Sequence, residues 1–126
     1  MLPKPTDGEL AILRILWQQG ASTVRTVNDA LNLKRDVGYT TTLKIMQIMF
    51  EKGLLDREKA GKTHIYHPLI EEEEAQTQLL DKLMDTAFQG SAKKLIMRAL
   101  GNRRSSQEEL DEIRKYLDQI SKENKD

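Results

Sequence analysis

Apolar residues recur at helical spacing along most of this chain, and the pattern is clearest in GYTTTLKIMQIMFEKG, from Gly38 to Gly53. One side of this stretch is an almost wholly apolar stripe made of Thr42, Ile45, Met46 and Met49. The opposite side is polar and consists of Thr40, Lys44, Gln47 and Glu51. Because residues three and four apart share a face of an α-helix, the stretch is predicted to be one amphipathic helix.

Two shorter helices are predicted ahead of it. Thr6 and Glu9 have the spacing of a capping box, and the helix that they begin runs to Gly20. Its large apolar residues are expected in the core, namely Leu13, Leu16 and Trp17. Either Ser22 or Thr23 is predicted to cap the second helix. The inner face of that helix consists of Val24, Val27, Ala30 and Leu31. A polar connection, residues 32–37, then leads to the amphipathic helix.

A β-hairpin is predicted directly after Gly53. Residues 54–59 and 63–68 read as two short strands, and Ala60-Gly61-Lys62 forms the turn between them. His64 and His67 point to opposite faces of the second strand and have no third ligand nearby, so we expect no metal site. Three helices followed by a hairpin with a basic tip are the components of a winged helix-turn-helix domain.

From Glu71 onward only helices are predicted. Four successive glutamates favour a helix start, Gly90-Ser91 interrupts the pattern, Gly101 ends the next helix, and Ser106 begins the last one. The apolar faces of these helices are wider than one segment can bury alone, so we expect a homodimer. The residues predicted at its interface are Leu79, Leu83, Leu95, Ile96, Leu100, Leu110, Ile113 and Leu117. The alternative is that these helices pack back onto the N-terminal domain.

The predicted fold class is therefore mainly α with a small β-hairpin. Residues 1–70 are expected to form a winged helix-turn-helix domain, residues 71–122 a helical dimerisation region, and residues 123–126 a polar tail. A chain of 126 residues with 38% hydrophobic content fits a small domain with a helical extension. The formal net charge is zero, but residues 1–68 hold ten Lys and Arg against seven Asp and Glu, and residues 69–126 hold ten against thirteen. The positive N-terminal half favours a polyanionic partner.

Several function classes are disfavoured. The chain has no Cys, which excludes disulfides, thiolate metal sites and cysteine nucleophiles. No pair of carboxylates suggests acid–base catalysis and no glycine-rich phosphate loop is present, so we expect neither an enzyme nor a cofactor or small-molecule ligand. The sequence shows no signal peptide and no run of about eighteen apolar residues, so a cytoplasmic location is expected.

The polar side chains of the amphipathic helix suit the DNA major groove. Threonine can bond a base edge or touch a thymine methyl, Gln47 can pair with adenine, and Lys44 can reach guanine or a phosphate. Arg35, in the connection before the helix, and Lys62, at the hairpin tip, are placed for phosphate contacts. Two alternatives are a merely solvated helix face and a winged-helix module that binds protein instead of DNA.

Four segments resemble the penicillinase-repressor family of bacterial regulators, the BlaI, MecI and CopY group. In chain order they are ELAILRILWQQG, TVRTVNDAL, GYTTTLKIMQIMFEKGLL and REKAGKTHIYHPLI. The resemblance implies a homodimeric transcriptional repressor that binds a pseudo-palindromic operator in double-stranded DNA, similar to β-lactamase repressors. It also places Tyr39, Thr40 and Thr41 at the start of the recognition helix. Beyond them the chain departs from the family pattern at Leu43, Lys44 and Ile48, so its operator is expected to differ.

The resemblance also bears on how repression ends. In the family, a membrane sensor protease often cuts an Asn-Phe bond in the dimerisation region, and the alignment sets Arg98-Ala99 at that position. Because the dipeptide is missing, we expect either cleavage at a different bond by a cognate protease or release without cleavage. Copper-responsive members use a Cys cluster, which this chain lacks.

Overall fold

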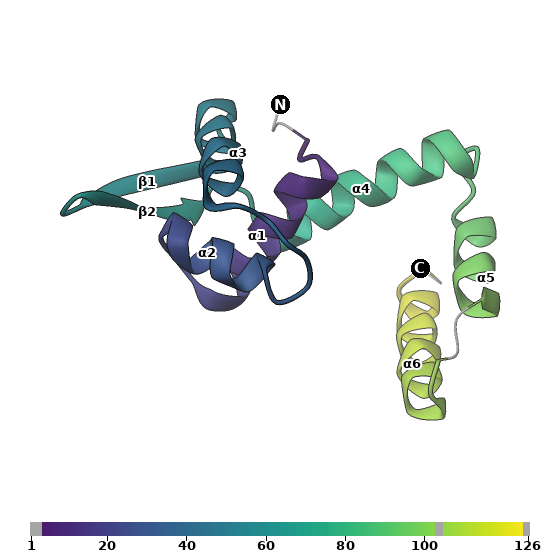
Figure 1. The fold of residues 1–126 in the computed structure, drawn as a ribbon. Coiled ribbons are helices and arrows are strands. Elements are labelled where there is room, and N and C mark those ends of the chain that lie inside the picture. Colours follow the sequence, from purple (N-terminus) through teal and green to yellow (C-terminus); the bar gives the residue numbers. More distant parts are fainter. Residues whose placement is uncertain (1–3, 103–104, 125–126) are drawn as a thin grey trace. The chain divides into compact units, whose positions relative to one another are not determined.

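The computed structural model describes residues 4–102 and 105–124, and within them it contains six helices and one antiparallel hairpin (Figure 1). In chain order the elements are α1 (Asp7–Gln19), α2 (Val24–Leu31), α3 (Tyr39–Lys52), β1 (Leu55–Ala60), β2 (Thr63–Pro68), α4 (Glu72–Ala87), α5 (Ala92–Asn102) and α6 (Gln107–Glu123). The predicted mainly α fold with a small hairpin is confirmed. The chain divides into two compact units between Asp81 and Lys82.

A single hydrophobic core holds the first unit together. Its buried residues come from α1, α2, α3, the hairpin and the start of α4: Ile12, Leu13, Leu16, Val24, Val27, Leu31, Met46, Met49, Leu54, Leu55, Tyr66, Ile70 and Ala75. Burying one such large side chain contributes about 1.5–3 kcal/mol. The helical faces predicted from the sequence therefore meet in one place, although Trp17, Ala30 and Ile45 are only partly buried.

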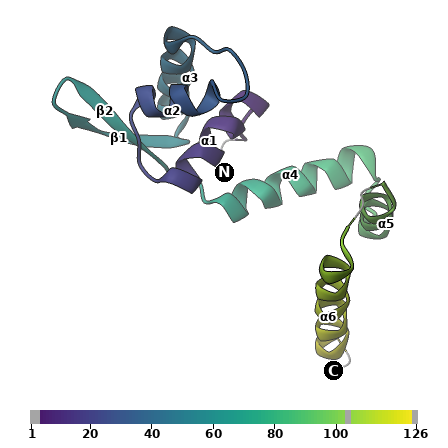
Figure 2. The same ribbon diagram turned by 60° about the horizontal axis from the view of Figure 1, so that its bottom comes forward.

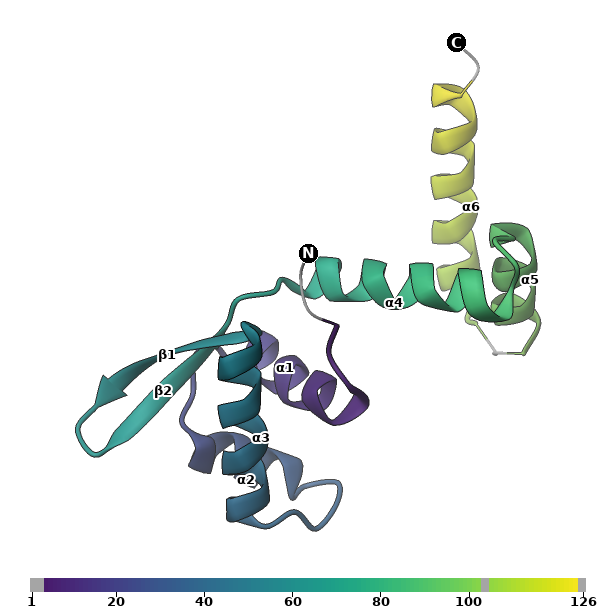
Figure 3. The ribbon, with the colours of Figure 1, turned by 90° about the horizontal axis from the view of Figure 1, so that it is seen from above.

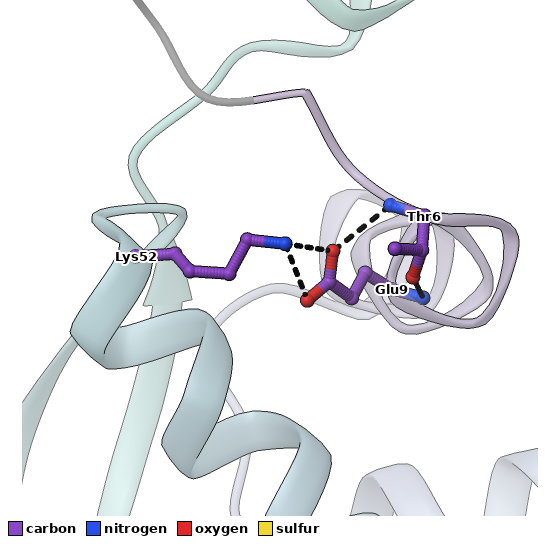
Figure 4. Close-up of polar contacts among 3 residues, drawn as sticks. All are labelled: Thr6, Glu9 and Lys52. Atoms are coloured by element: carbon purple, nitrogen blue, oxygen red, sulfur yellow. Dashed lines mark hydrogen bonds and ion pairs between the residues drawn. The ribbon is translucent and has the colours of Figure 1, made fainter.

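Helix α1 begins with the predicted capping box. The Glu9 amide donates to Thr6 Oγ1 at 3.2 Å, and the Thr6 amide donates to Glu9 Oε1 at 2.9 Å (Figure 4). These reciprocal bonds satisfy backbone donors that have no partner within the helix. At the other end Gly20 adopts φ 86°, a conformation that glycine favours, and stops the helix as expected.

Helix α2 is capped by Thr23, whose side chain accepts from the Thr26 amide at 3.2 Å. The alternative cap, Ser22, has a different role. It forms an isolated antiparallel bridge with Tyr66, in which the Ser22 amide donates to the Tyr66 carbonyl at 3.0 Å and the Tyr66 amide donates back at 2.8 Å. This bridge fastens the start of α2 to β2.

Two asparagines fix the connection between α2 and α3. The buried Asn28 donates from Nδ2 to the Val37 carbonyl at 2.9 Å and to Thr42 Oγ1 at 2.8 Å. Asn32 donates to the same carbonyl and accepts from the Val37 amide. Thr42 is fully buried, so its hydroxyl needs this partner. The start of α3 is thus held against α2 by hydrogen bonds that sequence periodicity did not reveal.

The hairpin projects away from the three helices (Figures 2 and 3). Its register pairs Leu55 with Pro68 at the base and Ala60 with Thr63 at the tip. Strand β1 starts one residue later than predicted, because the Leu54 amide donates to the Met49 carbonyl at 2.9 Å and so completes the end of α3 around Gly53. The tip turns at Gly61, where φ is 65°.

The chain leaves the hairpin past α1. The half-buried Trp17 donates from Nε1 to the Ile70 carbonyl at 3.0 Å, and Ala75 in the first turn of α4 is fully buried. This bond joins residues 53 positions apart in sequence. The N-terminal end of α4 therefore belongs to the same core as α1.

Helices α5 and α6 occur in the predicted order, but α5 ends later in the chain than predicted. The prediction that Gly101 ends α5 is wrong, since the helix includes Gly101 and Asn102; glycine inside a helix costs only about 1 kcal/mol relative to alanine. Ser106 caps α6 as expected, accepting from the Glu109 amide at 3.0 Å. Within the part of the chain that the structure describes, no helix is long and apolar enough to cross a membrane.

Candidate nucleic-acid interface

Helix α3 has one buried face and one exposed face. Thr42, Met46 and Met49 are buried in the core. The residues predicted to contact DNA from this helix are all exposed: Tyr39, Thr40, Thr41, Lys44 and Gln47. The helix is therefore anchored by one face and leaves donors and acceptors of the other face available for base edges.

The wing supplies a basic tip. Lys62 is exposed directly after Gly61, and Lys59 is exposed at the end of β1. The tip of the hairpin projects away from the three helices (Figure 2), and the exposed lysines there are placed to meet a phosphate backbone beside α3.

The start of α2, the start of α3 and strand β2 enclose a groove of about 270 Å³, which we call the wing groove. Two residues predicted from the sequence, Tyr39 and Lys62, line it together. Arg25 also lines the groove, with its guanidinium carbon 4.9 Å from the centroid of the Tyr39 ring. Such a cation–π contact orients both side chains at the entrance of α3.

Among the other residues that line the wing groove, Arg25, Thr63 and His64 carry polar or charged side chains that were not predicted to contact DNA. One feature of the sequence could have indicated Arg25 as a phosphate contact. It is a cation two residues after the cap of α2, in the helix that precedes the recognition helix. No local pattern in the sequence indicated Thr63 and His64, because β2 comes to lie beside α2 only when the hairpin folds onto the helices.

Arg35 occupies a different place from the other predicted contacts. It is exposed in the connection between α2 and α3, and it lines a groove between α1 and α2 together with Arg14 and Lys34. The structure does not bring it into the wing groove. Its predicted phosphate contact stays a prediction.

The histidines of β2 have separate surroundings. The His64 ring lies 6.3 Å from the ring of Tyr66, centroid to centroid, whereas His67 Nε2 lies 4.0 Å from Asp56 Oδ2 on β1. Among residues 4–102 and 105–124, no three His, Asp or Glu side chains are grouped as metal ligands would be.

The three C-terminal helices carry further candidate contact residues. None of the residues of α5 or α6, all of which the structure describes, is buried, and α4 buries only Ala75. Several large apolar side chains remain 38–64% exposed: Leu79, Leu80, Leu83, Ile96, Met97, Tyr116 and Leu117. Four of the predicted dimer residues are only partly covered, namely Leu95, Leu100, Leu110 and Ile113.

Three helices with a hairpin wing define a winged helix-turn-helix protein. The same fold occurs in the solution structure of the DNA-binding domain of the repressor BlaI, with a TM-score of 0.53, 23% identity, and coverage of 59% of this chain and 90% of that one. It also occurs in the monomeric form of Bacillus licheniformis BlaI in complex with the blaP half-operator, with a TM-score of 0.51 and the same identity and coverage.

Residues 5–119 match the family described as penicillinase repressor, and the chain belongs to that family. Among its relatives are the methicillin resistance regulatory protein MecI of Mammaliicoccus sciuri, 21% identical over 112 residues (89% of this chain, 91% of the relative), and the transcriptional regulator BlaI of Mycobacterium tuberculosis, 28% identical over 116 residues (90% and 83%). The family resemblance predicted from the sequence is confirmed.

Proposed function

We propose that this protein is a sequence-specific transcriptional repressor that binds a pseudo-palindromic DNA operator as a homodimer. The main support for this function is that α3 has two different faces. One face is buried in the core, and the other leaves Thr40, Lys44 and Gln47 exposed. A protein of the same fold, the monomeric form of Bacillus licheniformis BlaI, forms a complex with the blaP half-operator, which supports the same kind of partner.

Helix α3 enters the major groove of one half-site. Tyr39, Thr40 and Thr41 lie at the end of the helix that comes first in the chain, and Lys44 and Gln47 follow one and two turns later. Threonine, lysine and glutamine at this spacing offer hydrogen bonds to base edges. The wing groove, with Arg25 and Lys62, takes the adjacent phosphates and fixes the register of the helix on the duplex.

The C-terminal helices join two copies. The apolar side chains that α4, α5 and α6 each leave exposed cost free energy in water, and a two-fold partner that covers them removes that cost. Two winged-helix domains related by a two-fold axis read two half-sites of opposite orientation, which is why the operator is expected to be pseudo-palindromic.

Occupation of a promoter by this dimer blocks transcription. The alternative function is a winged-helix module that binds a protein and has no operator specificity. The two functions differ in their response to salt, since each phosphate that a cation neutralises releases counterions and makes the affinity fall as salt rises.

The experiment is a selection of genomic DNA fragments on the purified full chain, followed by sequencing and by affinity measurements on the enriched duplex at several salt concentrations. We expect enrichment of a sequence with two inverted half-sites and an affinity that falls steeply with salt. Recovery of unrelated fragments, together with an affinity for the enriched duplex no greater than for random duplex, would overturn the proposal in favour of the protein-binding module.

A further inference from the structure

A groove between α1 and α2 lies on the first unit and is distinct from the wing groove. It encloses about 310 Å³, and we call it the α1–α2 groove. Five apolar residues form much of its lining: Ala11, Ile15, Ala30, Leu31 and Leu33. Leu31 belongs to the hydrophobic core, and Ala11 and Ile15 pack against that core. Leu33 is exposed and contributes neither to the core nor to the proposed DNA contacts.

Leu33 is the most conspicuous of them. Its side chain is 87% exposed, yet it stands on an ordered turn. The Leu33 amide donates to the Ala30 carbonyl at 3.3 Å, and the Lys34 amide donates to the Leu31 carbonyl at 3.1 Å. The side chain of Asn32 holds the far side of the same turn through Val37. The fold therefore holds Leu33 at a fixed position, where it lines the groove together with the partly exposed Ala11, Ile15 and Ala30. A contiguous exposed apolar patch of this kind, unlike a lone exposed leucine, marks a binding surface.

The rim of the α1–α2 groove is positively charged. Arg14 reaches it from α1, and Lys34 and Arg35 reach it from the connection after α2. No Asp or Glu lines the groove; Asp36 follows Arg35 in sequence but is not among the lining residues. An apolar floor with three cations around it is complementary to an acidic partner that carries apolar anchors.

We propose that the α1–α2 groove docks an acidic amphipathic helix of a protein partner. Apolar side chains one turn apart on that helix pack on the floor beside Leu33, and its carboxylates pair with Arg14 and the cations of the turn. Laying one apolar helix face into a groove between two helices is a common mode of peptide recognition. The docking site adds a protein contact to the DNA contacts of α3 and the wing.

The test uses the full-length protein and displayed random peptides of about sixteen residues, enough for roughly four helical turns. Peptides are selected on the wild-type chain and then measured against variants. We expect enrichment of acidic peptides with apolar residues at i, i+3 or i+4, and i+7. Leu33→Ser and Arg14→Glu should each weaken their binding by about tenfold or more, as loss of a central anchor does. Leu69→Ser removes another exposed leucine, which lies outside the groove, and should change nothing.

Neither Leu33 nor Arg14 is a proposed DNA contact, so both variants should keep the wild-type helical content and operator affinity. Selected peptides that are basic or neutral, or that bind Leu33→Ser as well as wild type, would overturn the proposal. Loss of duplex binding by Leu33→Ser would reassign the groove to nucleic acid. A change in sedimentation of that variant would reassign it to contacts between copies of this chain. Because operator binding is measured separately, failure of the docking proposal leaves the proposed repressor function intact.

Discussion

Lys52 Nζ donates to both carboxylate oxygens of Glu9, to Oε1 at 2.7 Å and to Oε2 at 2.9 Å, and so joins the last turn of α3 to the first turn of α1 (Figure 4). The Glu9 side chain is 6% exposed and that of Lys52 is 34% exposed. Glu9 therefore has two tasks, since it completes the cap of α1 and also fixes the recognition helix against α1.

The pH dependence of stability follows from this pair. Burial raises the pKa of Glu9, but the hydrogen bonds from Lys52 and Thr6 and the charge of Lys52 lower it by more, so the pKa lies below the ordinary 4.5. A carboxyl whose pKa is lower in the folded state contributes stability that is present above the unfolded pKa and lost as pH falls through the folded pKa. Lys52→Met should lower the free energy of unfolding by about 1–3 kcal/mol near neutral pH, because it leaves a buried charge with fewer partners.

The measurement is urea unfolding at one fixed protein concentration, near neutral pH and at a pH below the lowered folded-state pKa of Glu9. The difference between wild type and Lys52→Met should shrink as the pH falls through that pKa, because Glu9 then becomes protonated in both proteins. Lys44→Met, which removes an exposed lysine of the same helix, is the control and should stay close to wild type. A Lys52→Met deficit that is independent of pH would show that the ion pair is not its cause.

Thr42 is expected to contribute to the stability of the fold, whereas the exposed residues beside it are expected to contribute to DNA binding. Thr42→Val removes the acceptor of the Asn28 Nδ2 bond at 2.8 Å in a fully buried place and should cost about 1–3 kcal/mol. Thr42→Ser keeps the hydroxyl and should retain more of that stability. Thr41→Val is the matched control, since Thr41 is exposed on the same helix. Equal stability of Thr41→Val and Thr42→Val in urea unfolding would contradict the role of the Asn28 bond.

Lys44 is expected to read a base. Lys44→Ala should weaken operator binding by about 1–3 kcal/mol and reduce discrimination at one position of the half-site. Fluorescence anisotropy with the operator and with single-base variants measures both effects. Lys62→Ala is the contrast, because a wing-tip phosphate contact should be lost on specific and random duplex alike, with a shallower salt dependence. If Lys44→Ala behaves like Lys62→Ala, the lysine contacts phosphate; unchanged binding would remove it from the interface.

The last helix is expected to hold the dimer. Leu117→Asp or Ile113→Asp should separate the two copies, because an unpaired charge would be buried at the interface. The separated chains should keep the folded winged-helix unit and bind half-sites only, since none of the core residues of that unit comes from α6. Analytical ultracentrifugation measures the mass. Lys115→Asp, on an exposed polar position of the same helix, is the control. A Leu117→Asp protein that sediments as a dimer would exclude α6 from a central role.

Release of this protein from DNA is expected not to involve cleavage at an Asn-Phe bond. Arg98 and Ala99 occupy the position that the family resemblance aligns with such a bond, and both lie inside α5, where cutting requires local unfolding. The only nearby Asn is Asn102, and it is followed by Arg103, so no equivalent bond with an apolar residue after Asn is present there. A family protease tuned to Asn-Phe should leave the purified dimer intact in mass spectrometry after prolonged incubation, while it cuts a relative that carries the dipeptide. A clean cut between Arg98 and Ala99 would contradict this hypothesis.

The sequence by itself determined the elements and the division of α3 into a buried and an exposed face. Helix faces and caps depend on residues within one or two turns, so the burial of Met46 and Met49, the capping box of Thr6 and the exposure of Lys44 followed from local spacing. The turn at Gly61 was equally local. The family was also readable, because its motifs retain their order along the chain.

Only the tertiary structure decided how these elements meet. The bond of Lys52 to Glu9 spans 43 positions and that of Trp17 to Ile70 spans 53, and nothing in local periodicity specifies such partners. The same holds for Ser22, which bridges to β2 instead of capping α2, and for Arg25, which the packing of α2 places over Tyr39. Such contacts depend on where the core fixes each helix, because burial of apolar faces sets the arrangement and the polar side chains then bond whichever groups lie within reach.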